Sequence, residues 1–524
     1  MEIAILTIFL VNIVNILASE ERKIKNWDAQ IELNLSLNRD DKESDAVKLP
    51  GRNLDQTKTF SSQLRRDLES RRLPVRSSAT IGGYIEQDLD HFDARERRKW
   101  KQYFFYNTNN QKSPNDLNFL MLGGEGPIYE SQVLDGALMM MIWAKSYGAA
   151  AYSLEHRFYG DSQPMPGNTS TANLKYLTSE QALADAAVFI QSINKKEKIQ
   201  HPKWVVFGGS YPGNLAAWLR EKYPELVVGA VASSAPVRAK LDYFEYYQTV
   251  EKALDNFGTP SCAQDTRNYF SQAQSFLQTS AGRKALGMCN KEVDSTQRSV
   301  RDGHYFIESQ LSNNFGWNTQ SDSLDHAKVI GACKWSKDMY DRATANFKSG
   351  NVAESEITAS ATAPKNSSCT DYSYDEYVKT VSDIAPTWYR SWLWQTCTEF
   401  GYYQTIGPGH KTFGGASLPA KYSIDVCADV FGLNSSSIES AIFNTNKFYG
   451  GSDNFNATNV VFINGSEDPW HPLSLYQYPI DSVKTILIEG TSHCRDMYSP
   501  TSADPLQLRR ARETVNIEIA KWIA

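Results

Sequence analysis

The chain has 524 residues, a formal net charge of −6, 41% hydrophobic residues and 22% charged residues. A chain of this length and composition can bury a large core, and its length indicates two or three structural units. The mildly acidic balance provides no basic surface for phosphates, which excludes nucleic acid as an expected partner.

The first 19 residues are predicted to be a secretory signal peptide. Residues 4–18 form an apolar run that a serine and a charged stretch follow. The run is short for a membrane span, and small residues lie near a plausible cleavage point. An uncleaved signal anchor is the alternative. No later stretch is long and apolar enough to cross a bilayer, so we expect no membrane span after signal removal.

Residues 20–82 are charged, poor in aromatic residues and without a sustained period. This composition is typical of a flexible leader or propeptide, because such a segment cannot bury enough apolar surface to fold. A helical arm around residues 60–72 is the alternative.

Strand and helix patterns alternate over residues 83–239, which we interpret as the first part of an α/β domain. Strands are predicted at 100–106, 118–122, 149–154, 204–207 and 226–231, with a helix at 179–193. This alternation predicts a mostly parallel sheet covered by helices.

Ser210 lies at a sharp turn between the predicted strand 204–207 and an apolar helix around 215–219. An α/β-hydrolase holds its nucleophile at such a turn, and small residues are needed around it because strand and helix approach closely. Pro212 stands where glycine is usual, but its fixed φ suits a first helical turn, and Gly213 follows. Four other serines also follow Gly-x without these flanking elements, namely Ser162, Ser417, Ser452 and Ser492. Ser210 is therefore the candidate nucleophile.

Acyl transfer also needs hydrogen-bond donors for the oxyanion. The backbone amide of Tyr211 is the first candidate, because it follows the nucleophile. Gly124, in the glycine-rich turn 123–126 after a predicted strand, is the second. A tight turn with only a structural role is the alternative for the glycines.

Residues 240–440 interrupt the alternation and are predicted to form an inserted helical cap. Six cysteines lie in this region, which predicts three disulfides in an oxidising compartment, although six cysteines allow 15 pairings and spacing does not choose among them. Cys494 stands apart. No Cys-x-x-Cys pair exists, and we expect neither a metal nor another cofactor.

Sequons for N-glycosylation fit the same secretory context. We expect modification at five of them, namely Asn34, Asn168, Asn366, Asn434 and Asn456. Asn464 is expected to stay unmodified, because it lies near a predicted strand end.

Residues 441–524 are interpreted as the second part of the α/β domain, with strands at 459–463 and 483–488 and a closing helix at 506–523. Asp468 follows the first strand and His493 the second, which gives the chain order serine, acid, histidine. We interpret Asp468 as the acid and His493 as the base.

Three neighbouring candidates are weighed against this assignment. Glu467 could be the acid instead, since either carboxylate can orient an imidazole. His471 shares the loop of Asp468 and is interpreted as a rim residue. His156 precedes Ser210 and would break the order, which favours a structural role.

Four segments resemble the S28 family of serine peptidases, namely 155–160, 177–185, 208–211 and 232–237, and the similarity runs from about Tyr84 to the C-terminus. The loops 465–471 and 490–497 look closest to the thymus-specific branch of that family. The resemblance implies an α/β-hydrolase fold with a large disulfide-bonded helical cap. It also implies the pairs Cys262–Cys333, Cys289–Cys369 and Cys397–Cys427, with Cys494 unpaired.

The resemblance further implies exopeptidase action on peptides, often beside proline, in an acidic vesicle or outside the cell. Trp392, Trp394, Phe400 and Tyr402 could form an apolar pocket for a proline ring, and Glu399 could face a substrate amine. The alternative is that this aromatic group is core.

We therefore expect a secreted or lysosomal serine exopeptidase, similar to a Pro-X carboxypeptidase, that forms an acyl-enzyme. The alternatives are a dipeptidyl aminopeptidase of the same family, a lipase- or esterase-type hydrolase, and a catalytically silent binding protein. Formation of a homodimer is left open.

Overall fold

The structure, a computed structural model, describes residues 80–524 except 135, 137, 290–292, 294–296, 350–368, 408 and 410. The predicted signal peptide and nearly all of the predicted leader lie outside the described residues, as do Asn34 and Asn366. The described part begins in a strand at Thr80, which overlaps the end of the predicted leader.

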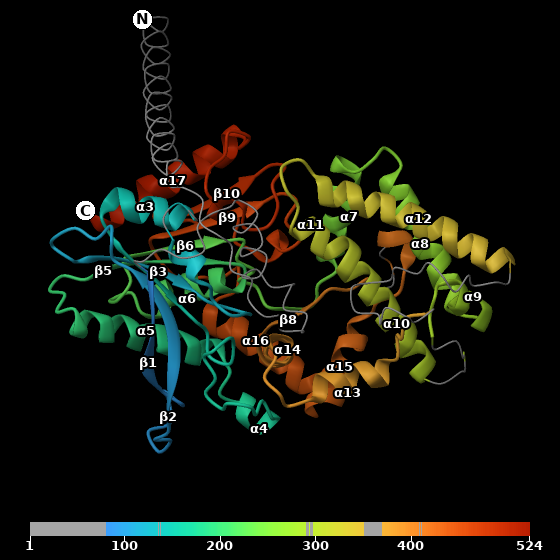
Figure 1. Cartoon of the computed structure of the whole chain (residues 1–524), viewed down its shortest axis with the longest axis horizontal. Coiled ribbons are helices and arrows are strands. Elements are labelled where there is room, and N and C mark those ends of the chain that lie inside the picture. The colour runs from blue at the N-terminus through green and yellow to red at the C-terminus, as the bar shows by residue number, and fades with distance from the viewer. Residues whose placement is uncertain are drawn as a thin grey trace, which may run out of the picture.

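An eight-stranded sheet fills one half of the molecule (Figure 1), in the order β1-β2-β4-β3-β5-β6-β9-β10. From β4 to β10 all neighbouring strands are parallel, whereas β2 is antiparallel to β1 and β4. The strands are β1 (Thr80–Asp88), β2 (Lys99–Asn107), β3 (Leu117–Leu122), β4 (Ala150–Leu154), β5 (Lys203–Gly209), β6 (Gly229–Ser233), β9 (Val460–Gly465) and β10 (Val483–Ile488). This is the strand order of an α/β-hydrolase.

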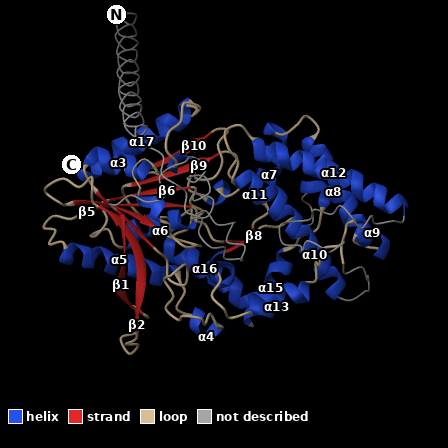
Figure 2. Ribbon diagram, viewed as in Figure 1, coloured by secondary structure: helices blue, strands red, loops and turns tan. Residues whose placement is uncertain are grey.

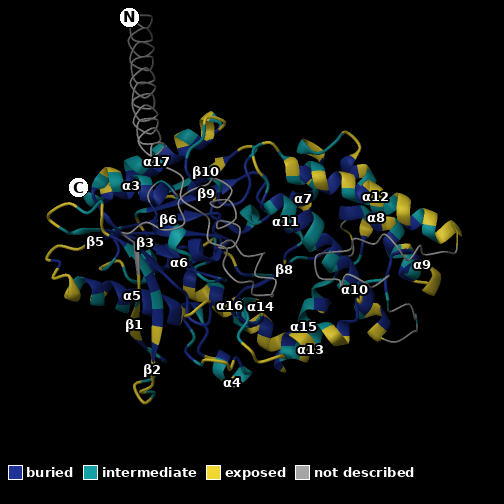
Figure 3. Cartoon of the chain, viewed as in Figure 1, coloured by how far each residue is buried: buried dark blue, intermediate teal, exposed yellow. Residues whose placement is uncertain are grey.

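Helices cover both faces of the sheet. Val206 and Phe462 face one side with α5 and α6, whereas Val205 and Val461 face the other side with α3 and α17. Because both faces are covered, the central strands are buried throughout (Figure 3). The helical elements of this part are η2 (Glu130–Val133), α3 (Met139–Tyr147), α4 (Thr171–Leu174), α5 (Ser179–Lys196), α6 (Tyr211–Lys222), η6 (His471–Leu473), η7 (Arg495–Met497) and α17 (Leu506–Ile523).

Each predicted strand lies on an observed strand, with bounds that differ by up to three residues. Strand β6 begins at Gly229, three residues after the predicted start at 226, because the chain turns at residues 224–226 after leaving α6. The long antiparallel strand β1 was not predicted as a strand.

Between β6 and β9 the chain forms a second, mainly helical layer beside the sheet (Figure 2). Its elements are α7 (Glu245–Phe257), α8 (Cys262–Phe276), α9 (Ser280–Ala285), α10 (Gln297–Leu311), η3 (Ser312–Gly316), α11 (Trp317–Gln320), α12 (Ala327–Ser349), α13 (Tyr374–Ser382), α14 (Trp388–Gln395), η4 (Thr396–Phe400), η5 (Thr412–Gly415), α15 (Ala420–Phe431) and α16 (Ser435–Tyr449). The short strands β7 (Lys240–Asp242) and β8 (Gly401–Tyr403) pair within it. We call this layer the cap.

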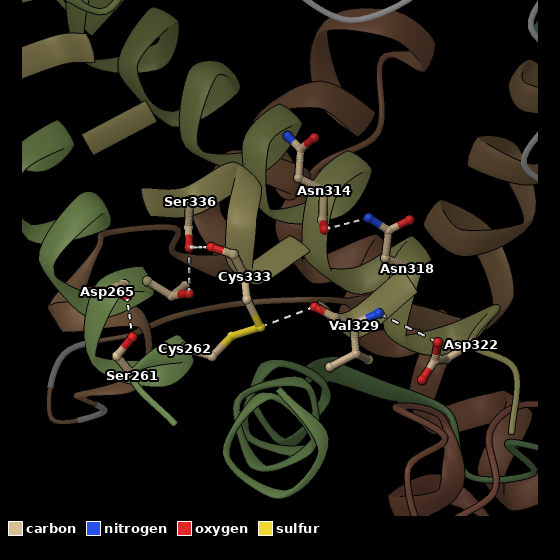
Figure 4. The surroundings of a disulfide bond; sticks show 10 residues. Ser261, Cys262, Asp265, Asn314, Asn318, Asp322, Val329, Cys333 and Ser336 are labelled. Atoms are coloured by element: carbon tan, nitrogen blue, oxygen red, sulfur yellow. Dashed lines mark hydrogen bonds between the residues drawn. A yellow bond between two sulfur atoms is a disulfide. The ribbon is translucent and has the colours of Figure 1, made fainter. Parts of the chain in front are cut away.

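Three disulfides cross-link the cap, and they are the pairs that the resemblance implied. Cys262–Cys333 joins α8 to α12 (Figure 4), Cys289–Cys369 closes a loop of 80 residues, and Cys397–Cys427 joins η4 to α15. Cys494 is buried and unpaired. The disulfides fit a protein of the secretory pathway.

The sequons in the described part differ in exposure. Asn168, Asn434 and Asn456 are exposed, whereas Asn464 is buried in β9. Glycosylation at the first three stays a prediction. Within the described ranges, no helix has both the length and the apolar character that crossing a bilayer requires.

Candidate active site

A sharp turn joins β5 to α6 and carries Ser210. Its backbone has φ 66° and ψ −136°, a conformation that costs an L-residue on the order of 1–3 kcal/mol and that persists only where the surroundings enforce it. The Ser210 amide donates to the Ser233 carbonyl (2.9 Å), and the Ser210 carbonyl accepts from the Gly213 amide (2.8 Å). These bonds hold the serine at the carboxyl end of β5 in the geometry of a nucleophile elbow.

The turn contains small residues because the end of β5 and the start of α6 approach each other closely. A Cβ on Gly208 would lie 1.9 Å from the Pro212 carbonyl oxygen, and one on Gly213 would lie 2.8 Å from the Ser233 carbonyl oxygen. Pro212 is tolerated where glycine is usual because Gly124, on the loop after β3, leaves room for its ring. A Cβ on Gly124 would lie 2.4 Å from Pro212 Cγ.

The loops after β9 and β10 bring Asp468 and His493 together, because the carboxyl ends of parallel strands share one edge of the sheet. His493 Nδ1 lies 2.8 Å from Asp468 Oδ1, and both side chains are buried. Asp468 Oδ1 also accepts the Trp470 amide (2.9 Å). The carboxylate is therefore fixed in the orientation that holds the imidazole.

The surroundings of His493 stabilise the imidazolium that forms when it takes up a proton. Burial lowers the pKa of His493, but Asp468 and Cys494, through their charges and hydrogen bonds, together outweigh burial and raise the pKa well above its usual range. With Nδ1 donating to Asp468, Nε2 is the nitrogen that can take up a proton. This is the arrangement that a general base beside a serine requires.

The three alternative residues occupy other places. Glu467 Oε1 accepts from the Ser466 hydroxyl (3.0 Å), whereas His493 bonds to Asp468. His471 bonds to Tyr476 through Nδ1. His156 is buried and bonds to the Arg157 carbonyl and, through Nε2, to the Tyr211 hydroxyl (2.9 Å).

The end of β6 connects the serine turn to the histidine loop. Ser233 accepts from the Ser210 amide, and the hydroxyl of Ser234 accepts from the Cys494 amide (2.8 Å). Ser210 and Cys494, the residue after His493, are therefore bonded to two consecutive serines, Ser233 and Ser234. These two bonds fix the serine turn relative to the histidine loop.

Glu125 is a further residue beside both groups. Its carboxyl lies near both groups, since Ser210 and His493 both act on its pKa. Burial raises the pKa of Glu125 to about 7, and Oε2 is buried without a hydrogen-bond partner. Sequence reasoning named the turn around Glu125 but missed this side chain. The signal was available, since Glu125 is the one charged residue of that turn.

The two oxyanion candidates lie next to each other. Tyr211 is the first residue of α6, and the first amides of a helix have no acceptor within the helix. Gly124 is packed against Pro212 on the opposite side of the turn. The assignment of both amides as oxyanion donors stays a prediction that this adjacency supports.

The cap contacts the catalytic loops through the end of α11. The Gln320 carbonyl accepts from the His493 amide (3.3 Å) and from the Ser492 hydroxyl (2.8 Å). Gln320 Oε1 accepts from Trp470 Nε1 (2.9 Å). One cap residue therefore binds both the acid loop and the base loop, a contact that sequence reasoning missed.

The aromatic residues that were predicted to form a substrate pocket differ in burial. Phe400 is fully buried against Tyr211 (ring centroids 5.2 Å apart), and Trp394 is buried against Phe431 (5.2 Å). Neither presents a surface to substrate in this structure, so the core interpretation replaces the pocket interpretation for these two. Trp392 is half-buried and contacts Tyr211 (5.5 Å).

Two half-buried tryptophans flank this region. The Tyr402 ring lies between them, 6.5 Å from Trp392 and 5.4 Å from Trp470. Trp392 and Trp470 therefore form an aromatic wall that runs from the residue after the nucleophile to the acid loop. Trp470 was not singled out from the sequence.

Glu399 does not point to a substrate amine. It is buried, and its two oxygens accept from the Ser179 amide (2.9 and 3.1 Å), the Ser179 hydroxyl (2.6 Å) and Gln395 Nε2 (3.3 Å). Because Ser179 begins α5, Glu399 joins that helix to the cap. We therefore correct the prediction that it faces substrate.

Across the described ranges, no three His, Cys, Asp or Glu side chains gather in a way that could hold a metal ion.

The chain is similar to known serine peptidases over most of its length. Residues 87–515 match the family model described as serine carboxypeptidase S28. A putative serine protease of Caenorhabditis elegans is 37% identical over 83% of this chain and 83% of its own. The thymus-specific serine protease of Mus musculus is 33% identical over 84% and 87%. The lysosomal Pro-X carboxypeptidase of Homo sapiens is 26% identical over 84% and 88%. The chain therefore belongs to the serine carboxypeptidase S28 family.

Proposed function

We propose that the protein is a serine exopeptidase that cleaves peptides through an acyl-enzyme, with Ser210 as nucleophile, His493 as general base and Asp468 as the acid that orients it. The observation that carries this proposal is the Asp468–His493 hydrogen bond (2.8 Å) at the strand edge that also holds the strained Ser210 turn. Family membership supports the same activity.

The proposed reaction has two halves. Ser210 Oγ attacks the scissile carbonyl carbon while His493 Nε2 takes its proton, and the amides of Tyr211 and Gly124 donate to the oxyanion. His493 then gives the proton to the leaving amine, and the peptide bond breaks. A water molecule, deprotonated by His493, releases the acyl group and restores Ser210.

The cap supports action at a peptide end. It follows β6 in the chain and binds the catalytic loops through Gln320, so it overlies the loop edge of the sheet. A layer in that place restricts how far a long chain can pass the serine. We further propose carboxypeptidase action beside proline, in the secretory pathway or lysosomes, which the Pro-X carboxypeptidase relative supports.

A panel of peptides blocked at one end or the other tests the direction of cleavage. Carboxypeptidase action predicts hydrolysis of N-terminally acetylated peptides and loss of hydrolysis on C-terminal amidation. The reverse pattern would assign the protein as an aminopeptidase. Peptides with proline, alanine or leucine before the scissile bond, analysed by mass spectrometry, test the preferred residue.

A further inference from the structure

The loop after His493 carries a second buried carboxyl group, Asp496, that the proposed reaction does not use. Asp496 lies on η7, three residues after His493, and it is 5% exposed. Its Oδ1 accepts from the hydroxyl of Ser233 (2.5 Å), the last residue of β6. This bond therefore joins the histidine loop to the central sheet.

Ser233 also holds the nucleophile. Its carbonyl accepts from the Ser210 amide (2.9 Å), and it lies opposite Gly209 in the parallel pairing of β5 and β6. A single residue thus binds Ser210 through its backbone and Asp496 through its side chain. Because Asp496 is three residues from His493, the position of Ser233 helps to set the place of the serine relative to the histidine.

Three residues around this bond have left-handed backbone conformations. The φ angles are 66° for Ser210, 48° for Ser234 and 57° for Cys494. Such conformations cost free energy in residues other than glycine and persist only where surrounding contacts enforce them. The Cys494 amide donates to the Ser234 hydroxyl (2.8 Å), and the Ser233–Asp496 bond lies beside it. Both bonds are enforcing contacts, since each joins one strained segment to the other.

Helix α17 holds η7 from a second direction. The buried guanidinium of Arg512 donates to three backbone carbonyls, those of Arg495 (3.2 Å), Asp496 (3.0 Å) and Tyr498 (2.9 Å). Arg512 itself pairs with Asp504. The segment η7 is thus bonded to α17 through its backbone and to β6 through the Asp496 side chain.

The carboxyl of Asp496 has mainly apolar surroundings. It lines a small cavity beside the end of β5, together with Phe207, Gly208 and apolar side chains of α3. Burial raises the pKa of Asp496 to about 6, although Ser233 and the charge of Arg512 lower it, so the carboxyl is ionised at pH 7. Apolar side chains offer a carboxylate no hydrogen-bond donor, so loss of the Ser233 hydroxyl would be costly.

We propose that Asp496 is a positioning residue for the proposed triad, whose carboxylate binds Ser233 and thereby fixes the Ser210 turn relative to the His493 loop. Asp496 acts through Ser233 and not on the reacting atoms. Proton transfer from Ser210 to His493 requires a short, aligned contact, and small displacements of either group slow the reaction. The inference rests on the proposed function, because it concerns the same serine and histidine.

The rate of labelling by a serine-directed fluorophosphonate tests this role, because labelling requires an activated Ser210 but no peptide substrate. Asp496→Ala and Ser233→Ala should each lower the second-order rate about tenfold, the factor that corresponds to one hydrogen bond of ordinary strength. Ser233→Ala keeps the backbone carbonyl that binds the Ser210 amide and removes only the side-chain bond. With a peptide substrate, both variants should lower kcat by a similar factor and change KM by less than about twofold.

The double variant Asp496→Ala, Ser233→Ala tests whether the two residues act through each other. Once one partner is absent, the other has no bond to lose, so the double variant should be labelled about as fast as either single variant. Losses that multiply, to about 100-fold in the double variant, would show independent effects and overturn the proposal.

The fraction of molecules labelled at the end of the reaction separates positioning from folding. Positioning predicts slow labelling that reaches the wild-type fraction. A smaller labelled fraction that reacts at the wild-type rate would indicate a purely structural role and overturn the proposal. Thr501→Val is the matched control, since the Thr501 hydroxyl donates to the Asp504 carboxylate (2.8 Å) in the segment between η7 and α17. Thr501→Val should be labelled at the wild-type rate, and an equal decrease there would contradict a specific role for Asp496.

Labelling also distinguishes this inference from the proposed function. A wild-type protein that the probe does not label would refute the serine nucleophile, and both proposals would fail. If the wild-type protein is labelled but cleaves no peptide, only the exopeptidase proposal fails, and slow labelling of Asp496→Ala would still support the positioning role. Equal labelling rates in the wild type, Asp496→Ala and Ser233→Ala would refute the role of Asp496 alone.

Discussion

At the residue scale, Glu125 adds a titratable carboxyl beside the proposed triad. Its carboxyl lies near Ser210, and burial raises the pKa of this carboxyl to about 7. Below pH 7 the carboxyl is neutral. Above pH 7 it carries a negative charge, which competes with His493 for the Ser210 hydroxyl and repels the developing oxyanion. Ionisation of Glu125 should therefore decrease activity as the pH rises through 7.

Substitution Glu125→Gln tests this pH dependence. The wild-type kcat/KM should fall about tenfold on the alkaline side of an ionisation near pH 7, and the fall should be absent in Glu125→Gln. The measurement is a profile of kcat/KM against pH with a neutral substrate. An unchanged alkaline limb in the variant would contradict the role of Glu125.

The sequence identified residues whose roles follow from their place in the chain. Ser210 was identified because a strand precedes it and an apolar helix follows, and Asp468 and His493 because each follows a late strand. Glu399 and Phe400 were misinterpreted because their partners, Ser179 and Tyr211, are far away in sequence. The direction of a buried side chain depends on such non-local packing, which a local pattern does not contain.

At the element scale, the short helix α11 connects the cap to the two loops that carry Asp468 and His493. Its last residue, Gln320, accepts hydrogen bonds from both catalytic loops. Helix α11 follows directly on η3, so the hydrogen bonds of Gln320 attach both catalytic loops to the cap. No sequence pattern marks this contact, because Gln320 and His493 are 173 residues apart.

Gln320→Ala should lower kcat about threefold to tenfold, because it removes the acceptor of the Trp470 indole and leaves the backbone contacts in place. The control is Asn318→Ala on the same helix, whose side chain bonds to the Asn314 carbonyl (2.8 Å) within the cap (Figure 4). Steady-state kinetics of both variants check this. A decrease of the same size in Asn318→Ala would assign the effect to helix stability.

At the scale of the whole molecule, the sheet and the cap differ in what stabilises them. The sheet is buried between helices on both faces, whereas the cap carries three disulfides. The two layers are joined by contacts such as the stacked rings of Trp218 and Tyr449 (3.8 Å). A mostly parallel sheet covered by helices was predictable from the alternating strand and helix patterns. The arrangement of the cap helices was not, since their pairing depends on contacts distant in sequence.

Removal of Cys262–Cys333 should destabilise the cap. The disulfide closes a loop of 71 residues, and the loss of that cross-link is expected to cost about 4 kcal/mol in the free energy of unfolding. The double substitution Cys262→Ser, Cys333→Ser should lower Tm in a thermal unfolding experiment. An equal Tm for the variant and the oxidised wild type would contradict the expected contribution.

The central claim is that Ser210, His493 and Asp468 act together as a triad. It is tested most directly by labelling with a serine-directed fluorophosphonate, read by mass spectrometry, alongside peptide hydrolysis. We predict that the wild-type protein is labelled at Ser210, that Ser210→Ala loses labelling and activity, and that Asp468→Asn lowers kcat by about 10⁴-fold. Labelling and hydrolysis that persist at the wild-type level in Ser210→Ala would contradict the account.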